Sequence, residues 1–430
     1  MLNRRMSARP FTPMPGKICM SDDGSLGADQ GAAEAAPMLQ ARLVIEGEIP
    51  TTHIIGRLIG EAAGNAEGVC KLLVSNFLPG RMQSNAIPLL IRVGDPSAAP
   101  MVKWMLRRKI PYLYYIDDNF WELQGEGPLI AYYQAKEVRE TLELVVRNAH
   151  TVIVNSPHLG KYLRDHFAAS VIVLPAPFDF SLLSRLEPPP AHEHEVRIGF
   201  AGSATREKDF IAVLPALERV LAERPQVTMH FFGYCPPLLH GKDRVVYHPH
   251  MGSYEDFIRF KHASALDIGL APMADTESNR YKTNNKYREY GALGIAGVYA
   301  DSPPYRDSVK NGVTGLIVRQ DAEAWYRAIV GLVDNPQQRA AMAAAAYEDV
   351  RKHYAQDVVA MQWRALLEEF QRSVRMPRLS RAAISADTCW IRGAGWLARQ
   401  KLRVHLRYVR ARSLLARMVR TIQGRMKGAA

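Results

Sequence analysis

A lysine and a glutamate lie three residues apart at the start of an expected helix in the second half of the chain. Lys286 and Glu289 follow an apolar strand and a polar loop, and Thr283 or Asn284 is the natural N-cap. Side chains three residues apart share one helix face, and a helix N-terminus favours anions. The pair therefore suits a nucleotide sugar, with the ammonium on the diphosphate and the carboxylate on ribose or sugar hydroxyls. The alternative is an ordinary surface ion pair, which the small residues that follow disfavour.

A glycine-containing turn is a second candidate for phosphate binding. The strand expected at 196–201 ends in Gly202 and Ser203, and Arg206 and Lys208 follow them. Glycine lets the backbone approach a phosphate closely, and helix-end amides can donate to it. The two cations could neutralise a diphosphate. The motif is neither a P-loop nor a full GxGxxG, so a tight turn with solvent-facing charges is the alternative.

Two adjacent aspartates end an apolar strand in the first half of the chain. Asp117 and Asp118 alternate in direction on a strand, so at most one points straight into a cleft. That carboxylate could orient or deprotonate an acceptor hydroxyl, and Asp118 is the leading candidate. Trp121 offers a flat face to a sugar ring. The alternatives are a divalent metal site and capping by Asp118 or Asn119.

Histidines and threonines supply further polar candidates. Thr52 and His53 lie in the turn between the first expected strand and its helix. His53 could be a base or an acceptor ligand, and the threonine hydroxyl could cap the helix, but a single histidine is more often structural. His248 and His250 follow a later strand and could contact a nucleotide base or simply pack.

Short apolar runs alternate with amphipathic stretches from about residue 41, which is typical of βαβ units and a parallel sheet. We expect strands at 43–47, 70–75, 88–93, 112–116, 151–154 and 171–174, and again at 196–201, 227–232, 245–247, 266–271, 297–300 and 315–318. Helices are expected at 52–62, 98–108, 129–147, 159–167, 208–223, 254–263, 284–293, 322–334 and 336–353. The predicted fold class is α/β, with two Rossmann-like domains facing a central cleft where ligands collect at the carboxyl ends of the strands.

Composition divides the chain into five parts. Residues 1–40 lack periodicity and predict a disordered leader. Residues 41–186 form the expected N-terminal acceptor domain, and the polar, proline-rich stretch 187–195 is the linker. Residues 196–377 form the C-terminal donor domain with its closing helices, and 378–430 form a basic tail. The four cysteines are scattered and no secretory signal is recognisable, so we expect a reducing, cytoplasmic compartment.

The net charge of +12 is concentrated in the tail. Residues 381–430 hold twelve Lys and Arg residues and one acid, Asp387. Two neighbouring helical stripes are expected there, one basic (Arg399, Arg403, Arg407, Arg410, Arg417, Arg425) and one mostly apolar (Leu397, Val404, Tyr408, Ala411, Leu415, Met418, Ile422, Met426). This pattern suits an anionic membrane surface. A nucleic-acid contact is the less favoured alternative because no RNA-binding motif accompanies the tail, and a solvated face packed on the body is another.

Several of these segments resemble a known family. Similarity to the C-terminal domain of group 1 glycosyltransferases, which are GT-B enzymes related to family 4, lies in Asp267–Pro272, Lys286–Ile295, Asp301–Tyr305 and Asn311–Leu316. Upstream, Tyr114–Trp121 resembles the group's YxIDDxxW segment, and Asn155, Ser156 and Pro175–Asp179 match its N-domain pattern. The likeness covers about residues 41–355.

The resemblance implies a nucleotide-sugar donor on the C-terminal domain and an acceptor on the N-terminal one. It implies that Gly202, Ser203, Lys208 and Lys286 face the donor phosphates and that Glu289 binds ribose or sugar. Further donor contacts are predicted at Arg206, Lys282, Asn285 and Tyr290. Family 4 commonly has a second glutamate upstream, where this chain has Tyr281.

The sequence thus predicts a glycosyltransferase that moves a sugar to a saccharide or lipid-linked acceptor, in surface polysaccharide or glycolipid synthesis. The resemblance implies retention of the anomeric configuration. Neither a metal nor a cofactor is expected, nor is nucleic acid, and the expected location is cytoplasmic, peripheral on the inner face of the cell membrane. The alternatives are a GT-B nucleotide-sugar epimerase and a non-catalytic, membrane-docked binding protein.

Overall fold

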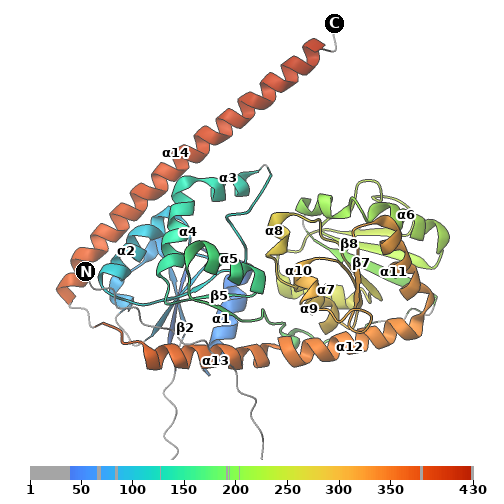
Figure 1. The fold of residues 1–430 in the computed structure, drawn as a ribbon, viewed down its shortest axis with the longest axis horizontal. Coiled ribbons are helices and arrows are strands. Elements are labelled where there is room, and N and C mark those ends of the chain that lie inside the picture. Colours follow the sequence, from blue (N-terminus) through green and yellow to red (C-terminus); the bar gives the residue numbers. More distant parts are fainter. Residues whose placement is uncertain are drawn as a thin grey trace, which may run out of the picture. The chain divides into compact units, whose positions relative to one another are not determined.

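The computed structural model describes residues 39–64, 69–82, 86–125, 127–189, 192, 194–202, 204–377 and 381–427, with side chains left out at 204–206, 381–383, 385–386, 410 and 412–427. In this part of the chain, two six-stranded parallel sheets pack against helices (Figure 1). The predicted α/β fold with two Rossmann-like halves is therefore confirmed. We call the first sheet with its helices the N-terminal lobe and the second the C-terminal lobe. The predicted leader lies almost wholly outside the described residues, as does part of the predicted linker.

The sheet of the N-terminal lobe has the strand order β2-β1-β3-β4-β5-β6. Its strands are β1 (Ala41–Ile45), β2 (Val69–Leu73), β3 (Ile87–Ile91), β4 (Leu113–Tyr115), β5 (Thr151–Val154) and β6 (Val171–Val173). Both faces are covered, since Leu43 and Val44 belong to separate buried clusters on opposite sides. The strand order reverses between β1 and β3, and ligands of such sheets bind outside this switch point.

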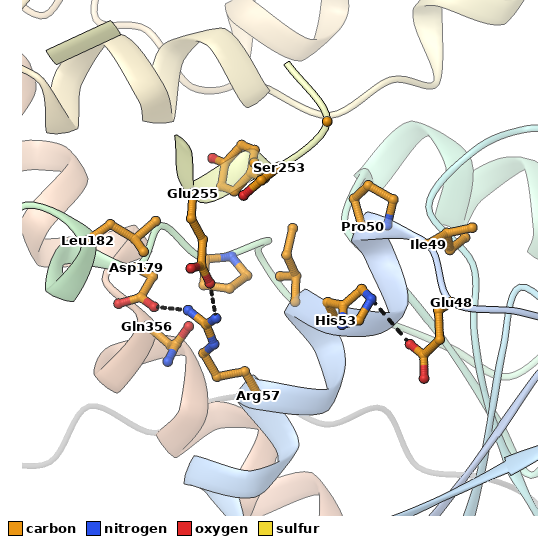
Figure 2. Close-up of a pocket in the computed structure, with 14 residues that line it drawn as sticks. Glu48, Ile49, Pro50, His53, Arg57, Asp179, Leu182, Ser253, Glu255 and Gln356 are labelled. Carbon is orange, nitrogen blue, oxygen red and sulfur yellow. Dashed lines mark hydrogen bonds and ion pairs between the residues drawn. The ribbon is translucent and has the colours of Figure 1, made fainter. Parts of the chain in front are cut away.

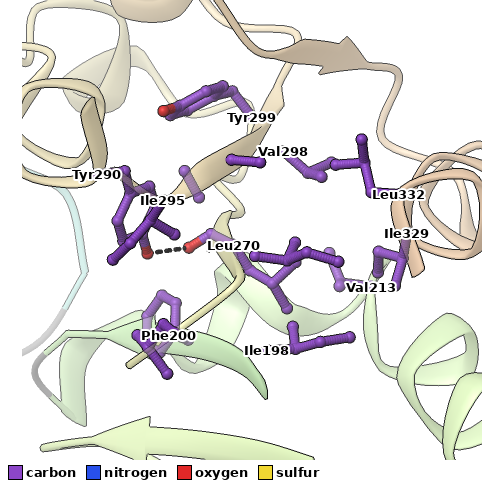
Figure 3. Packing of buried hydrophobic residues seen from close by; sticks show 14 of the residues in the cluster. Ile198, Phe200, Val213, Leu270, Tyr290, Ile295, Val298, Tyr299, Ile329 and Leu332 are labelled. Carbon is purple, nitrogen blue, oxygen red and sulfur yellow. Dashed lines mark hydrogen bonds between the residues drawn. The ribbon is translucent and has the colours of Figure 1, made fainter. Parts of the chain in front are cut away.

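The sheet of the C-terminal lobe has the strand order β12-β11-β10-β7-β8-β9. Its strands are β7 (Val196–Ala201), β8 (Val227–Phe232), β9 (Val245–His248), β10 (Ile268–Ala271), β11 (Ala296–Ala300) and β12 (Leu316–Val318). The order reverses between β7 and β10. Figure 3 shows the apolar side chains that pack in this lobe, among them Ile198, Leu270 and Ile329. The loops after β7, β8 and β9 therefore lie at the edge where a ligand is expected.

The helices largely follow the predicted pattern. The N-terminal lobe holds α1 (Pro50–Ala62), α2 (Ala99–Arg107), α3 (Pro128–Gln134), α4 (Lys136–Asn148) and α5 (Pro157–Phe167). The C-terminal lobe holds α6 (Leu214–Glu223), α7 (Tyr254–Ala263), α8 (Glu277–Arg280), α9 (Asn285–Ala292), α10 (Pro303–Arg306), α11 (Ala322–Asp334) and α12 (Pro336–Tyr354). Short 3₁₀ turns include η4 (Pro96–Ala98), η5 (Phe180–Leu182) and η6 (Ala204–Phe210). The helix predicted at 129–147 is interrupted at Ala135, whose backbone is extended.

One predicted boundary is wrong. The interval 196–377 was assigned wholly to the C-terminal domain, but α13 (Gln356–Ser373) packs on the N-terminal lobe. Its residues Val359, Trp363 and Leu367 share a buried cluster with Leu43 of β1 and Ile55 of α1. The amphipathic face of α13 is buried against that sheet, so α13 completes the core of the N-terminal lobe.

The basic tail forms one helix, α14 (Arg381–Lys427). It contacts η4 and α2 of the N-terminal lobe. Figure 1 shows α14 passing the N-terminal lobe and continuing beyond it. Among the described helices, none combines the length and apolarity needed to cross a membrane.

Candidate active site

A cavity of about 250 Å³ lies at the carboxyl edge of the sheet in the C-terminal lobe. The loops after β7, β8 and β9 form one wall, and α9 forms the other. The lining includes Gly202, Gly233, His250, Asn285, Lys286 and Glu289. Four residues that the sequence predicted for the donor (Gly202, Asn285, Lys286 and Glu289) are thus brought together.

Glycine is required where two of these loops meet. Gly233 has a φ of +81°, and a Cβ there would lie 2.6 Å from the carbonyl oxygen of Gly202. Only glycine tolerates both the left-handed backbone and this close approach. The part of the cavity wall at Gly202 and Gly233 is therefore formed by backbone.

Lys286 and Glu289 both line the cavity, and each side chain also contacts another residue of the C-terminal lobe. The carboxylate of Glu289 accepts a hydrogen bond of 2.9 Å from Nζ of Lys261, whose side chain is fully buried. That ammonium lies 4.4 Å from the ring centre of Tyr290, and Nζ of Lys286 lies 5.2 Å from the ring centre of Phe200. Lys261 was missed because it lies on α7, far from Glu289 in sequence.

Other donor-side predictions fall elsewhere. Tyr290 is fully buried, and its hydroxyl donates a 2.7 Å hydrogen bond to the carbonyl oxygen of Leu270 (Figure 3). Its ring packs directly over Gly269, where a Cβ would lie 2.6 Å from it. The prediction that Tyr290 contacts the donor is therefore wrong, because the ring belongs to the core.

The charged turn after β7 is only partly described. Ser203 lies outside the described residues, and so does the side chain of Arg206. Lys208 is exposed on η6 and is not part of the cavity lining. The helix predicted from residue 208 starts later, at Leu214. The structure thus gives no support to Lys208 as a phosphate ligand.

A second cavity, of about 210 Å³, adjoins the first. It is lined from the N-terminal lobe by Thr51, Tyr115 and Asp117 and from the C-terminal lobe by Arg288, among others. Asn285 and Glu289 line both cavities. The first cavity, which we call the donor cavity, therefore borders the cavity that Asp117 lines.

Asp117, and not Asp118, faces this second cavity. Its Oδ2 accepts a 3.1 Å hydrogen bond from the hydroxyl of Thr51, and its Oδ1 lies 3.3 Å from Nε of Arg92. Burial raises the pKa of Asp117 to about 6, against the lowering influence of Arg92. Asp118 is more exposed, lies outside the lining, and pairs with Arg92 at 3.4 Å and Lys282 at 3.9 Å. The preference for Asp118 is corrected in favour of Asp117.

Lys282 consequently contacts a carboxylate of the other lobe. Its Nζ lies 3.9 Å from Asp118 Oδ1, and it is not in the lining of the donor cavity. The predicted donor contact is replaced by a bridge between the lobes.

Arg92 was missed by sequence reasoning. It follows β3 with a φ of +51°, a left-handed backbone that is uncommon outside glycine. Its guanidinium also donates to the hydroxyl of Thr51 at 3.2 Å and lies 4.9 Å from the ring centre of Phe120. The sequence feature that could have identified it is an arginine directly after a buried strand, next to the point where the strand order reverses. Arg92 positions both aspartates.

A pH dependence follows from Asp117. A carboxylate that accepts a proton must be ionised, so kcat/KM should rise with pH through about 6 and level off above it. The check is a pH–rate profile of the wild type and the Asp117→Asn variant. The variant should lack the rise, and a wild-type profile that is flat through this pH would contradict the assignment.

The acceptor predictions Thr52 and Trp121 are wrong. Thr52 is buried, and its hydroxyl donates to the carbonyl oxygen of Ile49 at 2.8 Å, so it closes the start of α1. The neighbouring Thr51 supplies the cavity hydroxyl. The Trp121 ring is 7% exposed and packs on Phe167, with ring centres 4.7 Å apart. Neither side chain is available to a sugar.

His53 lies in a third cavity, of about 430 Å³, at the start of α1. Figure 2 shows His53 beside Glu48, with Nε2 3.3 Å from the carboxylate. In the same cavity Arg57 pairs with Asp179 at 2.6 Å and with Glu255 of α7. His53 is thus part of a cavity wall at the junction of the lobes, and its role toward an acceptor stays a prediction. His250 lines the donor cavity, whereas His248 packs on Phe232.

Arg288 is buried at the junction of the lobes. It donates hydrogen bonds to the carbonyl oxygen of Pro177 at 2.6 Å and to the side chain of Asn284 at 3.0 Å. Burial lowers the pKa of Arg288. Asn284 occupies the N-cap position of α9 without a capping side-chain bond, because its side chain binds Arg288 and Ser308. This network fixes the start of the helix that carries Lys286.

The sequence matches a known family over the residues that build the donor cavity. The family described as "Glycosyl transferases group 1" matches residues 195–335. This stretch, about a third of the chain, is similar to that family. The predicted family resemblance is confirmed for these residues, and a search of proteins of curated function gives no match.

Solved structures share the GT-B fold of the two lobes. A sucrose-phosphate synthase from Thermosynechococcus elongatus is similar at a TM-score of 0.55 and 16% identity, covering 78% of this chain and all of that one. The Anabaena protein HepE in complex with UDP is similar at a TM-score of 0.56 and 13% identity, covering 77% of this chain and 100% of that chain. The two lobes described above are the two halves of this fold.

Metal binding remains untested. In the described residues, no three His, Cys, Asp or Glu side chains are grouped closely enough to hold an ion. Asp117 and Asp118 instead share Arg92. The expectation that no metal or cofactor is needed stays a prediction.

Proposed function

We propose that the chain transfers a glycosyl unit from a nucleotide-sugar donor to an acceptor hydroxyl. The observation that carries this proposal is the pair of adjoining cavities, which share Asn285 and Glu289. One is bordered by a glycine backbone turn and Lys286, and the other presents the carboxylate of Asp117. The first cavity is built by the residues that are similar to group 1 glycosyltransferases.

In the proposed reaction, the donor diphosphate lies between the turn at Gly202 and Lys286. The bond between the anomeric carbon and the diphosphate oxygen breaks, and a bond to the acceptor oxygen forms. The proton of the acceptor hydroxyl passes to Asp117, and the nucleoside diphosphate leaves with its charge stabilised by Lys286 and the N-terminus of α9. Glu289, held by Lys261, binds a ribose or sugar hydroxyl. We propose retention of configuration, as the family resemblance implies, and this requires the acceptor oxygen to bond to the anomeric carbon on the same face from which the diphosphate leaves.

UDP is a reasonable first donor nucleotide to test. The HepE structures contain UDP or UDP-glucose. We propose a saccharide or lipid-linked acceptor in surface polysaccharide or glycolipid synthesis. The proposed partners are the donor, this acceptor and an anionic membrane surface contacted by residues 378–430, and the proposed location is the cytoplasmic face of the cell membrane.

The experiment is a thermal-shift screen with nucleoside diphosphates, followed by incubation with the matching nucleotide sugar with and without acceptor. Ligand binding to the native state raises the melting temperature. We expect one nucleotide to do so, and glycosylated product to form only when acceptor is present. An epimerised nucleotide sugar formed from donor alone would establish the epimerase instead. Binding without any turnover would support a non-catalytic protein.

A further inference from the structure

The helix α14 is anchored to the N-terminal lobe by one of its faces. Asp387 accepts hydrogen bonds from Nε1 of Trp104 at 2.7 Å and from Arg108 at 2.6 Å. Ile391 and Leu402 are buried against the lobe. At Gly395 a Cβ would lie 2.8 Å from the carbonyl oxygen of Ser97, so the helix backbone touches η4 directly. The first half of α14 is therefore a fixed part of the lobe.

The opposite face of α14 carries large apolar side chains in solvent. Leu397, Val404 and Tyr408 are 56%, 67% and 60% exposed, and Trp396 is 62% exposed. Spacings of seven and four residues place Leu397, Val404 and Tyr408 on one stripe of the helix. Trp390 precedes Leu397 by seven residues, is 44% exposed, and has Arg107 of α2 4.3 Å from its ring centre, so it borders the anchored part of the helix. A group of exposed apolar side chains of this size is typical of an interaction surface.

Basic side chains flank this stripe. Arg392, Lys401, Arg403 and Arg407 are all exposed. The acid Asp387, the single one in residues 381–430, points inward to Trp104 and Arg108. Arg399, which the sequence placed on the basic stripe, also points inward, since its Nε lies 3.6 Å from Asp95. The outward face is thus apolar, aromatic and cationic.

We propose that this outward face of α14 docks on an anionic phospholipid bilayer. Tryptophan and tyrosine favour the boundary between headgroups and acyl chains, and an amphipathic helix lies in that boundary with its apolar side immersed. Each basic side chain near an anionic surface contributes about 1 kcal/mol. A nucleic acid would satisfy the cations but offers no apolar layer for Leu397 and Val404.

The anchoring gives the docking a consequence for acceptor use. Because α14 is fixed to the lobe that carries Asp117, bilayer contact holds the acceptor side of the molecule at the lipid surface. This consequence for acceptor use rests on the proposed function, and it favours an acceptor hydroxyl that is carried by a lipid. The docking itself does not depend on the chemistry.

The test is co-sedimentation of the full chain with vesicles of phosphatidylcholine alone or mixed with phosphatidylglycerol. We expect binding to the mixed vesicles that weakens with salt, and little binding to phosphatidylcholine. Leu397→Ser/Val404→Ser and Arg403→Glu/Arg407→Glu should each lower the affinity by about tenfold or more. The matched control is Ile211→Ser/Leu238→Ser, at 74% and 62% exposed positions of the C-terminal lobe, which should bind as the wild type does.

Two results would overturn the proposal. One is vesicle binding that is absent in the wild type or unchanged in both α14 variants. The other is single-stranded RNA displacing the vesicles from the same face. Thermal unfolding of all variants should match the wild type, because the substituted side chains face solvent. Transfer to a soluble acceptor should also be unchanged, so loss of docking and loss of the proposed chemistry are separate outcomes.

Discussion

Replacing Asp117 with asparagine should lower kcat for glycosyl transfer by about 10²–10⁴-fold, the usual contribution of a general base. Of the adjacent aspartates Asp117 and Asp118, Asp117 is the one that lines the cavity shared with Glu289. Its pKa of about 6 leaves the carboxylate ionised at neutral pH. The donor cavity is untouched by the substitution. The dissociation constant of the nucleoside diphosphate should therefore change little.

The comparison variant is Asp118→Asn, measured in the same transfer assay. Asp118 lies outside the cavity lining and pairs with Arg92 and Lys282, so we expect a loss below about tenfold. A larger loss from Asp118→Asn than from Asp117→Asn would reverse the assignment and restore the original preference for Asp118.

Stability separates a chemical role of Asp117 from a structural one. Its pKa is raised from 3.8 to about 6 by burial, so the folded chain holds the proton more tightly than the unfolded chain does. Stability is therefore lost as pH rises from about 4 to about 6. Asparagine has no charge to bury, and the melting temperature of Asp117→Asn at neutral pH should equal or exceed that of the wild type. A variant that is inactive because it unfolds would instead melt earlier.

The Lys286→Ala variant should lose about 10²–10³-fold in kcat/KM, as happens when a charged group that stabilises a leaving anion is removed. Lys286 lines the donor cavity beside the N-terminus of α9. Part of the loss should appear as weaker binding of the free nucleoside diphosphate, because the ammonium contacts the same diphosphate before and after transfer. Titration calorimetry and steady-state kinetics measure the two parts.

The matched control for this lysine is Lys242→Ala. Lys242 is a half-exposed lysine of the same lobe that pairs with Glu218 at 2.8 Å, away from the cavity lining. Its removal should leave both binding and kcat/KM near the wild-type values. Equal losses in the two variants would mean that Lys286 acts only through the overall charge of the lobe.

The central strands could be predicted because they are buried on both faces. Continuous apolar runs such as Ile87–Ile91 identify such strands directly, and all twelve lie within two residues of the predicted positions. Polar and glycine residues after these apolar runs then indicated where the strands end, at the carboxyl edge of each sheet, where Gly202 and Asp117 lie. The helix α13 could not be placed in this way, since its apolar face does not indicate which of two similar sheets it covers.

The site was predicted less completely because its contacts join distant segments. Lys261 neutralises Glu289 from α7, and Arg92 holds Asp117 from the loop after β3. Neither pairing has a signature in local spacing. Thr52 and Trp121 were mistaken for ligands because residue type alone does not reveal burial. Periodicity predicted the exposed positions of Leu397 and Val404 on α14, but it placed Arg399 on the basic stripe, whereas its side chain turns inward to Asp95.

The central claim is that the diphosphate of a sugar donor is held in the C-terminal lobe next to Asp117. The most direct test is a crystal structure of the chain with the nucleoside diphosphate that raises its melting temperature most. We expect the diphosphate between the backbone at Gly202 and the ammonium of Lys286, with the terminal phosphate toward the cavity of Asp117. A nucleotide bound at any other place, with this cavity empty, would contradict the account.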